Sequence, residues 1–409
     1  MQRIAEKISS WGQGIPEISD AWLVLQTLPG MTPERLHRLV EKYDGPIEAL
    51  RAPVEALARI AGKKAAETLK QESPIDLAHK IRTEAEKNEV HILTRSDEKY
   101  PEHLKNIYAP PGAIFIKGEI QERDSLGVAI VGMRTPSSYG RRATQTLASA
   151  LAERGITIVS GMARGIDTES HRAAIEARGR TIAVLGCGLN INYPSGQEEL
   201  RNDIVSQGAV ISELPWNYPP RPENFPRRNR LISGLSLATV VVEAAQRSGA
   251  LVTARLALEQ GRELMVVPGP IDSGRSAGCH RLLKEGAHLV ESVDDILAAL
   301  PGYVMEKLSS LLNNSFPKSS QKKSTQKEKS SDYLGSLSHE EKMIFNHFDE
   351  DSSTIENMAK KTELKPELIS QIFLNLELRG FLRQTEGGLY EKILWGKDIP
   401  FNEINLIPR

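Results

Sequence analysis

Short apolar runs alternate with amphipathic stretches between Gly127 and Val293. Seven of these runs are rich in β-branched residues and lack polar alternation: VAIVG, ITIVSG, TIAVLG, AVISEL, ATVVVE, LMVVPG and HLVESV. Strands that are buried on both faces have this pattern, and they occur in parallel sheets covered by helices. Segments between them, such as YGRRATQTLASALAERG, have helical periodicity. The pattern predicts an α/β fold, an extended Rossmann-like, doubly wound and mostly parallel sheet within residues 86–302.

Residues 1–85 have a helical pattern. In LQTLPGMTPERLHRLVEKY, a turn at Pro29-Gly30 precedes a helix that Thr32 opens, with Glu34 close behind. The stretch ARIAGKKAAETLKQ repeats this helix–Gly–helix plan around Gly62. Such paired units resemble helix-hairpin-helix or SAM-like domains, which can offer backbone amides to DNA phosphates. A plain helical bundle with glycine turns fits the pattern equally well.

The C-terminal part divides into a linker and a small domain. Residues 303–336 are rich in Ser and Lys and poor in large apolar residues, which is typical of a flexible linker. Within 337–409, the stretches EEKMIFNHF, TIENMAKKT and KPELISQIFLNLELRGFL predict three helices, and LRQTEGGLYEKI predicts a hairpin. This is a winged-helix-like arrangement. The third helix carries Glu367, Glu377 and Arg379 and is not markedly basic, so we favour a protein-contact or structural role for the domain.

Composition limits the kinds of site that the chain can carry. With 52 basic and 53 acidic residues among 409, any nucleic-acid site must be a local basic patch. The two cysteines, Cys187 and Cys279, fit neither a disulfide framework nor a zinc site, so no metal is expected. No signal-peptide run and no membrane-length apolar window occur, and we expect a cytoplasmic protein without membrane insertion.

Residues with phosphate-binding chemistry follow several predicted strands. In an open α/β sheet, ligands bind at the carboxyl ends of the strands, where helix N-termini direct their amides outward. Small residues there permit close backbone approach, and hydroxyl or guanidinium groups can donate hydrogen bonds. The candidates are Arg134 and Ser137 after the first strand, Ser160, Gly161 and Arg164 after the second, and Ser248 and Gly249 after ATVVVE.

The stretch NFPRRNRLISGLS concentrates three arginines, Arg227, Arg228 and Arg230. It follows a proline-rich segment, so we expect these side chains on a loop near the strand ends. Arginines this close repel one another unless an anion meets them, and Phe225 beside them can stack on a base. In the alternative interpretation, Phe225 packs in the core and the arginines pair with nearby carboxylates: Glu213, Glu223 or Glu243.

Signals for an enzyme are weak. The nearest dinucleotide fingerprint, Gly186-Cys187-Gly188, has Ile191 in place of the third glycine, and no GK[ST] occurs, so no nucleotide cofactor is expected. Asp167 and His171 are spaced i,i+4, as a metal or acid/base pair can be. We favour a structural role in which Asp167 caps a helix and His171 faces a neighbouring loop, because no second His–carboxylate pair completes a metal site.

Six strings in order resemble the DNA-processing protein A family (DprA, also called Smf): VAIVGMRTPSSYG, IVSGMARGIDTESHRAAI, TIAVLGCGLNINYP, ISELPWNYPPRPENFPRRNRLISGLS, EAAQRSGALVTARLALEQGREL and VPGPIDSGRSAGCHRLLKEGA. The resemblance implies a protein, not known as an enzyme, that binds single-stranded DNA and dimerises through the Rossmann-like domain. It also implies that the protein loads RecA recombinase during natural transformation. It assigns DNA contacts to Arg134, Arg227, Arg228 and Arg230. Two positions depart from the family pattern: Asn190, where Asp is common, and His280, where Asn is common.

The expected function is therefore a single-stranded DNA-binding protein that protects incoming DNA and loads RecA onto it. A nucleotide-processing enzyme of the phosphoribohydrolase type, on a related Rossmann-like fold, is the alternative. Its PGGxGTxxE motif would correspond to AAQRSGALVTA, which lacks the paired glycines and the glutamate. A DNA-bound scaffold whose winged helix recruits partners is also compatible with the first function.

Overall fold

The computed structural model describes residues 17–304, 307, 308, 344, 352–362, 364–378, 382–384 and 389–392. The chain divides into two compact units, Met1–Pro317 and Lys318–Arg409. This division falls inside the segment expected to be a linker, whereas the predicted domain boundaries themselves stay a prediction. No helix within the described ranges combines the length and apolarity that crossing a bilayer requires.

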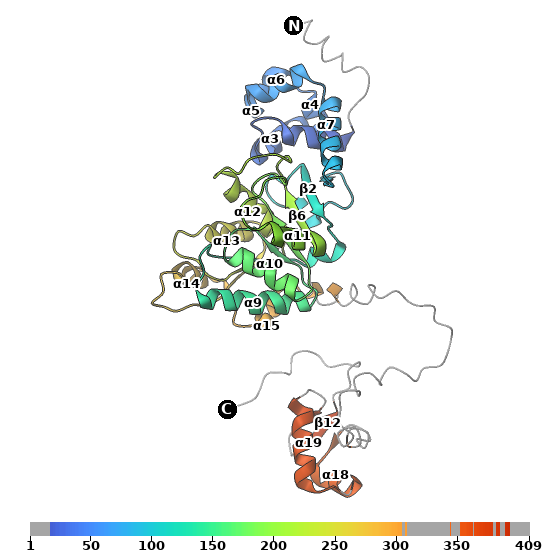
Figure 1. Cartoon of the computed structure of the whole chain (residues 1–409), viewed down its shortest axis with the longest axis vertical. Coiled ribbons are helices and arrows are strands. Elements are labelled where there is room, and N and C mark those ends of the chain that lie inside the picture. The colour runs from blue at the N-terminus through green and yellow to red at the C-terminus, as the bar shows by residue number, and fades with distance from the viewer. Residues whose placement is uncertain are drawn as a thin grey trace, which may run out of the picture. The chain divides into compact units, whose positions relative to one another are not determined.

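The first unit begins with a helical domain (Figure 1). Thr32 caps the second of its helices as predicted, because its side chain accepts a hydrogen bond from Arg35 N at 3.3 Å. Gly62 separates two further helices with a φ of 103°, a conformation that favours glycine. The helices are α2 Ile18–Thr27, α3 Pro33–Tyr43, α4 Pro46–Leu50, α5 Val54–Ala61, α6 Lys63–Gln71 and α7 Pro74–Lys87.

A nine-stranded sheet follows, in the order β1-β2-β6-β5-β4-β3-β7-β8-β9. All seven predicted strands are present, and they pair in parallel from β6 to β9. Two antiparallel strands that the pattern did not predict, β1 and β2, extend the sheet beyond β6. The strands are β1 His91–Thr94, β2 Ala113–Gly118, β3 Val128–Val131, β4 Ile158–Ser160, β5 Thr181–Val184, β6 Ala209–Ser212, β7 Ala238–Val241, β8 Glu263–Val266 and β9 His288–Leu289.

The order of the strands makes the sheet doubly wound. Strands β3 to β6 progress in one direction, and β7 to β9 start on the other side of β3. The connection therefore reverses between β3 and β7, and such a switch point opens a crevice at the carboxyl ends of the strands.

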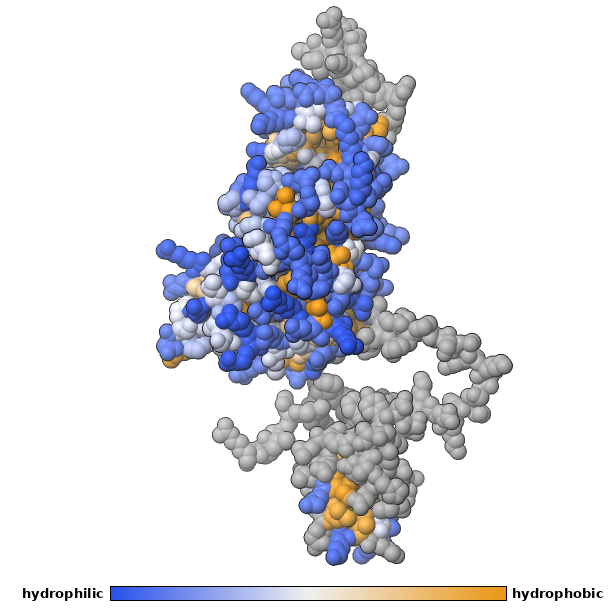
Figure 2. Space-filling model, in the orientation of Figure 1, coloured by the Kyte–Doolittle hydropathy of each residue, from blue (hydrophilic) through white to orange (hydrophobic). Residues whose placement is uncertain are grey.

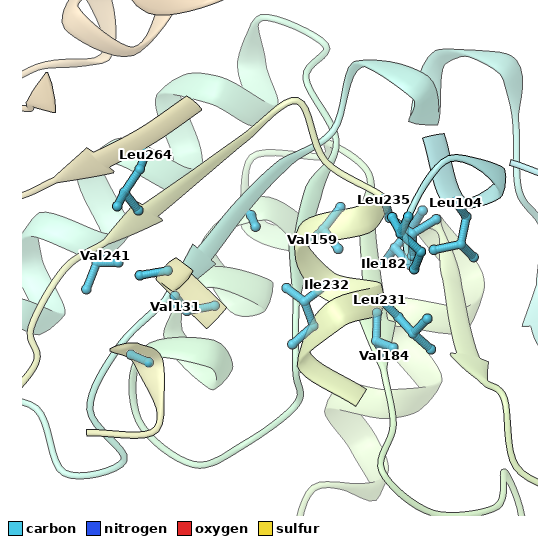
Figure 3. Packing of buried hydrophobic residues seen from close by; sticks show 14 of the residues in the cluster. Leu104, Val131, Val159, Ile182, Val184, Leu231, Ile232, Leu235, Val241 and Leu264 are labelled. Atoms are coloured by element: carbon cyan, nitrogen blue, oxygen red, sulfur yellow. The ribbon is translucent and has the colours of Figure 1, made fainter. Parts of the chain in front are cut away.

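Helices cover both faces of the sheet, which explains the uninterrupted apolar strands. In β3, Val128 and Ile130 pack toward one layer, and Ala129 and Val131 pack toward the other. Figure 3 shows Leu231 and Ile232 on the side of a helix that faces the sheet. One layer contains α9 Ser138–Glu153, α10 Ile166–Glu176, α11 Glu198–Gln207 and α15 Val293–Ala299, and the other contains α8 Glu102–Lys105, α12 Asn224–Gly234, α13 Ala250–Glu259 and α14 Ala277–Lys284. Hydrophilic residues dominate the face of the first unit that Figure 2 shows.

Gln26 of α2 ties the helical domain to the sheet. Its Nε2 donates to the carbonyl oxygens of Ala113, at 2.6 Å, and Glu213, at 2.8 Å. Its Oε1 accepts a hydrogen bond from Ala113 N at 2.9 Å. The amide side chain thus acts as a backbone-like partner for β2 and for the residue after β6, and it fixes α2 against the sheet.

The second unit contains α18 Ile355–Thr362, α19 Pro366–Leu378 and a three-stranded sheet in the order β10-β12-β11. Its strands are β10 Ser352–Ser353, β11 Leu382–Gln384 and β12 Tyr390–Lys392. Two of the three predicted helices and the hairpin are therefore found. Apart from Ile344, the predicted helix in EEKMIFNHF lies outside the described residues, as does most of the linker, and the winged-helix assignment stays a prediction.

Candidate nucleic-acid interface

Three cavities lie side by side at the carboxyl edge of the sheet. The switch-point cavity, of about 640 Å³, is lined by the loops after β3 and β7. The central cavity, of about 460 Å³, is lined by the loops after β4 and β5. The hairpin cavity, of about 220 Å³, is lined by the ends of β5 and β6 and by the α2–α3 hairpin. Arg228 lines all three, so the N-terminal half of α12 lies at their centre.

The loops after β3 and β4 are held together by close backbone contact. Gly165 has a φ of 87°, and a Cβ there would lie 2.3 Å from Met133 O. Ile166 N donates to the same carbonyl oxygen at 3.1 Å. This contact explains why the position before α10 is glycine, and it holds the β3 loop so that Arg134 is exposed at the rim of two cavities.

The arginine cluster lies on a helix, which corrects its predicted place on a loop. α12 begins at Asn224, directly after the proline-rich segment. Helical geometry sends neighbouring residues in different directions. Arg227 is exposed at the rim of the hairpin cavity, whereas Arg228 and Arg230 are only 5% and 7% exposed.

Arg228 donates hydrogen bonds to carbonyl oxygens at the ends of two strands, beneath the cavities. One guanidinium nitrogen, Nη1, donates to Gly161 O at 2.6 Å and also to Val184 O. A Cβ at Gly161 would lie 2.7 Å from Asp167 Oδ2 and 2.8 Å from Arg228 Nη2, so the two charged side chains leave no room for a side chain at this position. Burial raises the pKa of Asp167, and the charge of Arg228 and the hydrogen bond from Ala163 N oppose that rise. Arg228 is therefore a buried structural cation with one face on the cavities.

Arg230 does not line any of the three cavities, which corrects its predicted place in the pocket. Its Nη2 donates to Glu213 Oε2, and both side chains are about nine-tenths buried. This is the pairing that the alternative interpretation of the cluster predicted. Burial raises the pKa of Glu213, and Arg230 opposes this effect. Since Arg230 is buried and lies outside the lining of the three cavities, its guanidinium is not available to a phosphate bound there.

Both predicted serines near the first two strands are occupied by structural hydrogen bonds. Ser160 is fully buried, and its hydroxyl donates to Ile130 O at 2.6 Å. Ser137 caps α9 by accepting from Gly140 N at 3.0 Å, and its own N–H and hydroxyl donate to Glu243. Neither residue lines the three cavities, so both depart from the predicted site.

Two aromatic rings stand between the switch-point and central cavities. Tyr193 and Phe225 have ring centroids 5.1 Å apart and planes tilted by 38°. Phe225 packs closely on the backbone, since a Cβ at Gly186 would lie 2.8 Å from its ring. Tyr193 stays 40% exposed. The pair therefore presents an aromatic surface that is supported from below and open to a ligand.

The structure brings most of the predicted residues together. Those that line at least one cavity are Arg134, Gly161, Arg164, Phe225, Arg227, Arg228, Ser248 and Gly249. Sequence reasoning missed Tyr193, Asn229 and Arg247, which line the switch-point cavity. Two signals were available: the Tyr-Pro pair after the third predicted strand, and an arginine directly before Ser248.

The Asp167–His171 pair does not form a reactive centre. His171 is fully buried, and its Nδ1 lies 2.6 Å from Thr181 Oγ1 on β5, so the prediction that it faces a loop is wrong. Burial, with a smaller effect of Arg228, lowers the pKa of His171 to about 3. In the parts of the chain that the structure describes, no group of three or more His, Cys, Asp or Glu side chains could hold a metal ion.

His171 should make the first unit sensitive to mild acid. The folded state keeps the imidazole neutral down to about pH 3, whereas the unfolded chain binds a proton near pH 6.5. Stability is therefore lost as the pH falls below about 6.5, at up to about 1.4 kcal/mol per pH unit. We expect the unfolding free energy of the wild type to fall by about 2 kcal/mol relative to His171→Gln between pH 6.5 and 5, measured by urea unfolding. A constant difference across this range would contradict the assignment.

Comparison with known proteins identifies relatives of this chain. The family model described as DNA recombination-mediator protein A matches residues 91–301. Protein Smf of Escherichia coli (strain K12) is 41% identical over 299 residues, 73% of this chain and 76% of that protein. DNA processing protein DprA of Streptococcus pneumoniae (strain ATCC BAA-255 / R6) is 42% identical over 202 residues, 49% of this chain and 71% of that protein. The X-ray structure of DNA processing protein A from Streptococcus pneumoniae aligns with a TM-score of 0.61 at 33% identity, over 69% of this chain and 98% of that chain.

Proposed function

This chain belongs to the DNA recombination-mediator protein A family, and from that premise we propose that it binds single-stranded DNA along the carboxyl edge of its sheet. The strand lies across the switch-point and central cavities, with its phosphates on the exposed arginines and its bases toward the interior. The observation that carries this proposal is the combination of exposed guanidinium groups with an accessible aromatic pair at the rim of adjoining cavities.

The exposed cations suit a phosphate backbone. Arg134, Arg164, Arg227 and Arg247 are exposed and line the cavities, and they come from four separate segments of the chain. Since the chain as a whole carries a net charge of −1, this concentration of guanidinium groups is local. Arginine binds phosphate through paired N–H donors, so the rim can follow successive phosphates of one strand.

The aromatic pair favours a single strand over a duplex. Bases in a duplex are stacked and paired, and their faces are closed to side chains. Tyr193 is 40% exposed above Phe225, and a base that is free of its neighbours can stack on it. Stacking of this kind is worth about 1–3 kcal/mol per base and depends little on sequence. The proposed binding is therefore strong for single strands and largely independent of sequence.

We propose a finer role as well, that the chain acts as a homodimer in the cytoplasm, protects incoming DNA and delivers it to RecA recombinase during natural transformation. The support is the resemblance of its six motifs to the DNA-processing protein A family, together with the description of the matched family as recombination mediators. A nucleotide-processing enzyme is less well supported, because His171 is buried and Asp167 is held beneath Arg228. We therefore propose a binding protein without catalytic residues.

Fluorescence anisotropy with a labelled oligonucleotide and its duplex tests the proposal. The full chain should prefer the single strand, and the logarithm of its affinity should fall by about 0.7 for each phosphate contact per tenfold increase in salt. Four arginine contacts would give a slope of about −3. Equal affinity for the two DNA forms would contradict the proposed preference for a single strand. An affinity that does not change with salt concentration would contradict binding through the phosphate backbone. Absence of binding by the folded chain would redirect the search to nucleotide substrates.

A further inference from the structure

The hairpin cavity is a preformed pocket between the helical domain and the sheet. One wall is the α2–α3 hairpin, residues 28–33, and the others are the ends of β5 and β6 and the first turn of α12. The hydrogen bonds of Gln26 to Ala113 and Glu213 hold the hairpin wall against the sheet. The family model matches residues 91–301 and therefore does not include the hairpin.

Asn224 lines this cavity and has a buried side-chain donor without a partner in the described part of the chain. The residue is 6% exposed, and its Nδ2 has no hydrogen-bond partner among the residues that the structure describes. It is the first residue of α12, and its backbone N–H donates to Arg221 O at 3.0 Å, so the side-chain amide is the donor that the described residues leave without a partner. Buried side-chain donors almost always have a partner, and a ligand in the cavity would provide it.

Charge differs between the interior of this cavity and its rim. The interior contains the carboxylate of Glu213, already paired with Arg230, which would repel a phosphate. The rim contains the exposed Arg221 and Arg227, and the guanidinium of Arg221 lies 5.4 Å from the centre of the Tyr218 ring. A ligand with an uncharged polar ring inside and a phosphate outside matches this distribution.

We propose that the hairpin cavity binds one nucleobase of the single strand, with Asn224 Nδ2 donating to a carbonyl oxygen or ring nitrogen of that base. The sugar-phosphate lies on Arg221 and Arg227, which outnumber the one exposed rim carboxylate, Glu223. A volume of about 220 Å³ is below the range of roughly 300–1,000 Å³ that holds a drug-sized ligand and suits a single ring system. Because Arg228 lines all three cavities, one strand can pass from the switch point to the helical domain. This inference rests on the proposed single-strand binding.

Photocrosslinking locates the base directly. The full chain is irradiated with an oligothymidylate in which one residue is 4-thiothymidine, and the crosslinked peptides are identified by mass spectrometry. We expect crosslinks in the α2–α3 hairpin, residues 28–33, in addition to crosslinks near Tyr193 and Phe225. Crosslinks near these two rings without any in the hairpin would overturn the inference and leave the proposed function intact.

Two substitutions test the pocket by affinity. Met31→Trp fills the cavity, and Met31→Leu is the matched control that keeps its volume. Asn224→Leu removes the donor at a similar side-chain volume and adds no charge to the cavity. Loss of one base contact, worth about 1–3 kcal/mol, should weaken binding by roughly 5- to 150-fold for Met31→Trp. Asn224→Leu should weaken it at least about 5-fold, as expected for a hydrogen bond of about 1 kcal/mol or more.

The outcomes separate this inference from the function on which it rests. If the wild type does not bind single-stranded DNA, the proposed function fails and the pocket assignment fails with it. If the wild type binds and both Met31→Trp and Asn224→Leu bind within twofold of it, only the pocket assignment fails. Thermal unfolding of each variant identifies any that is misfolded. Should Met31→Trp misfold, Asn224→Leu and the crosslinks decide the question.

Discussion

Replacing Arg134 and Arg227 together with glutamate should weaken single-strand binding by at least about 100-fold at low salt. Each substitution removes a charge-assisted contact, worth about 1.5–3 kcal/mol, and introduces a repelling carboxylate. Both side chains are exposed at the rim of the cavities, so the fold should tolerate the change. The measurement is anisotropy titration with a labelled oligonucleotide across a salt series, in which the slope should become shallower by about 1.4, or 0.7 per lost contact.

The matched control is Arg178→Glu, which makes the same charge change at an exposed residue between α10 and β5. That position follows the C-terminal end of α10 and precedes β5, so it lies at the amino edge of the sheet, opposite the cavities. We expect Arg178→Glu to lower the affinity by less than about threefold, because only screened long-range attraction is lost. If the double variant and this control weaken binding equally, net charge rather than the proposed rim governs affinity.

The second large effect concerns stability. Arg228→Met should destabilise the first unit by about 3 kcal/mol or more, because it leaves the carboxylate of Asp167 buried without its cation. The carbonyl oxygens of Gly161 and Val184 also lose the guanidinium donor. Urea unfolding followed by circular dichroism measures this loss. Burial already raises the pKa of Asp167, and loss of the arginine should raise it further.

Combining Arg228→Met with Asp167→Asn distinguishes lost charge from lost packing. If the buried charge causes the effect, the double variant should recover more than about 1 kcal/mol relative to Arg228→Met. Arg228→Met within about 0.5 kcal/mol of the wild type would contradict a structural role for this arginine. The result also affects DNA experiments, since a weakened affinity in an Arg228 variant has to be compared with its folded fraction.

The pattern of apolar positions along the chain was sufficient to predict the parallel part of the sheet. The runs VAIVG and TIAVLG became β3 and β5 because a strand that is buried on both faces must be apolar at every position. Loops after such strands necessarily meet at one edge, so the sequence also placed Arg134, Arg164 and Gly249 near one another. The pattern did not predict β1 and β2, because these strands pair antiparallel at the border of the sheet and precede the alternating apolar runs.

What each arginine does was decided only by the tertiary structure. Along the chain, Arg227, Arg228 and Arg230 are equivalent members of one cluster. Rotation of about 100° per residue along α12 exposes the first, buries the second under the strand ends and directs the third to Glu213. The sequence by itself determined the sheet, the edge that carries the loops and the kind of chemistry gathered there. Only the packing of α12 against strands distant in sequence separated the cation that can meet a ligand from the two that hold the fold together, because burial and partners are properties of the folded chain.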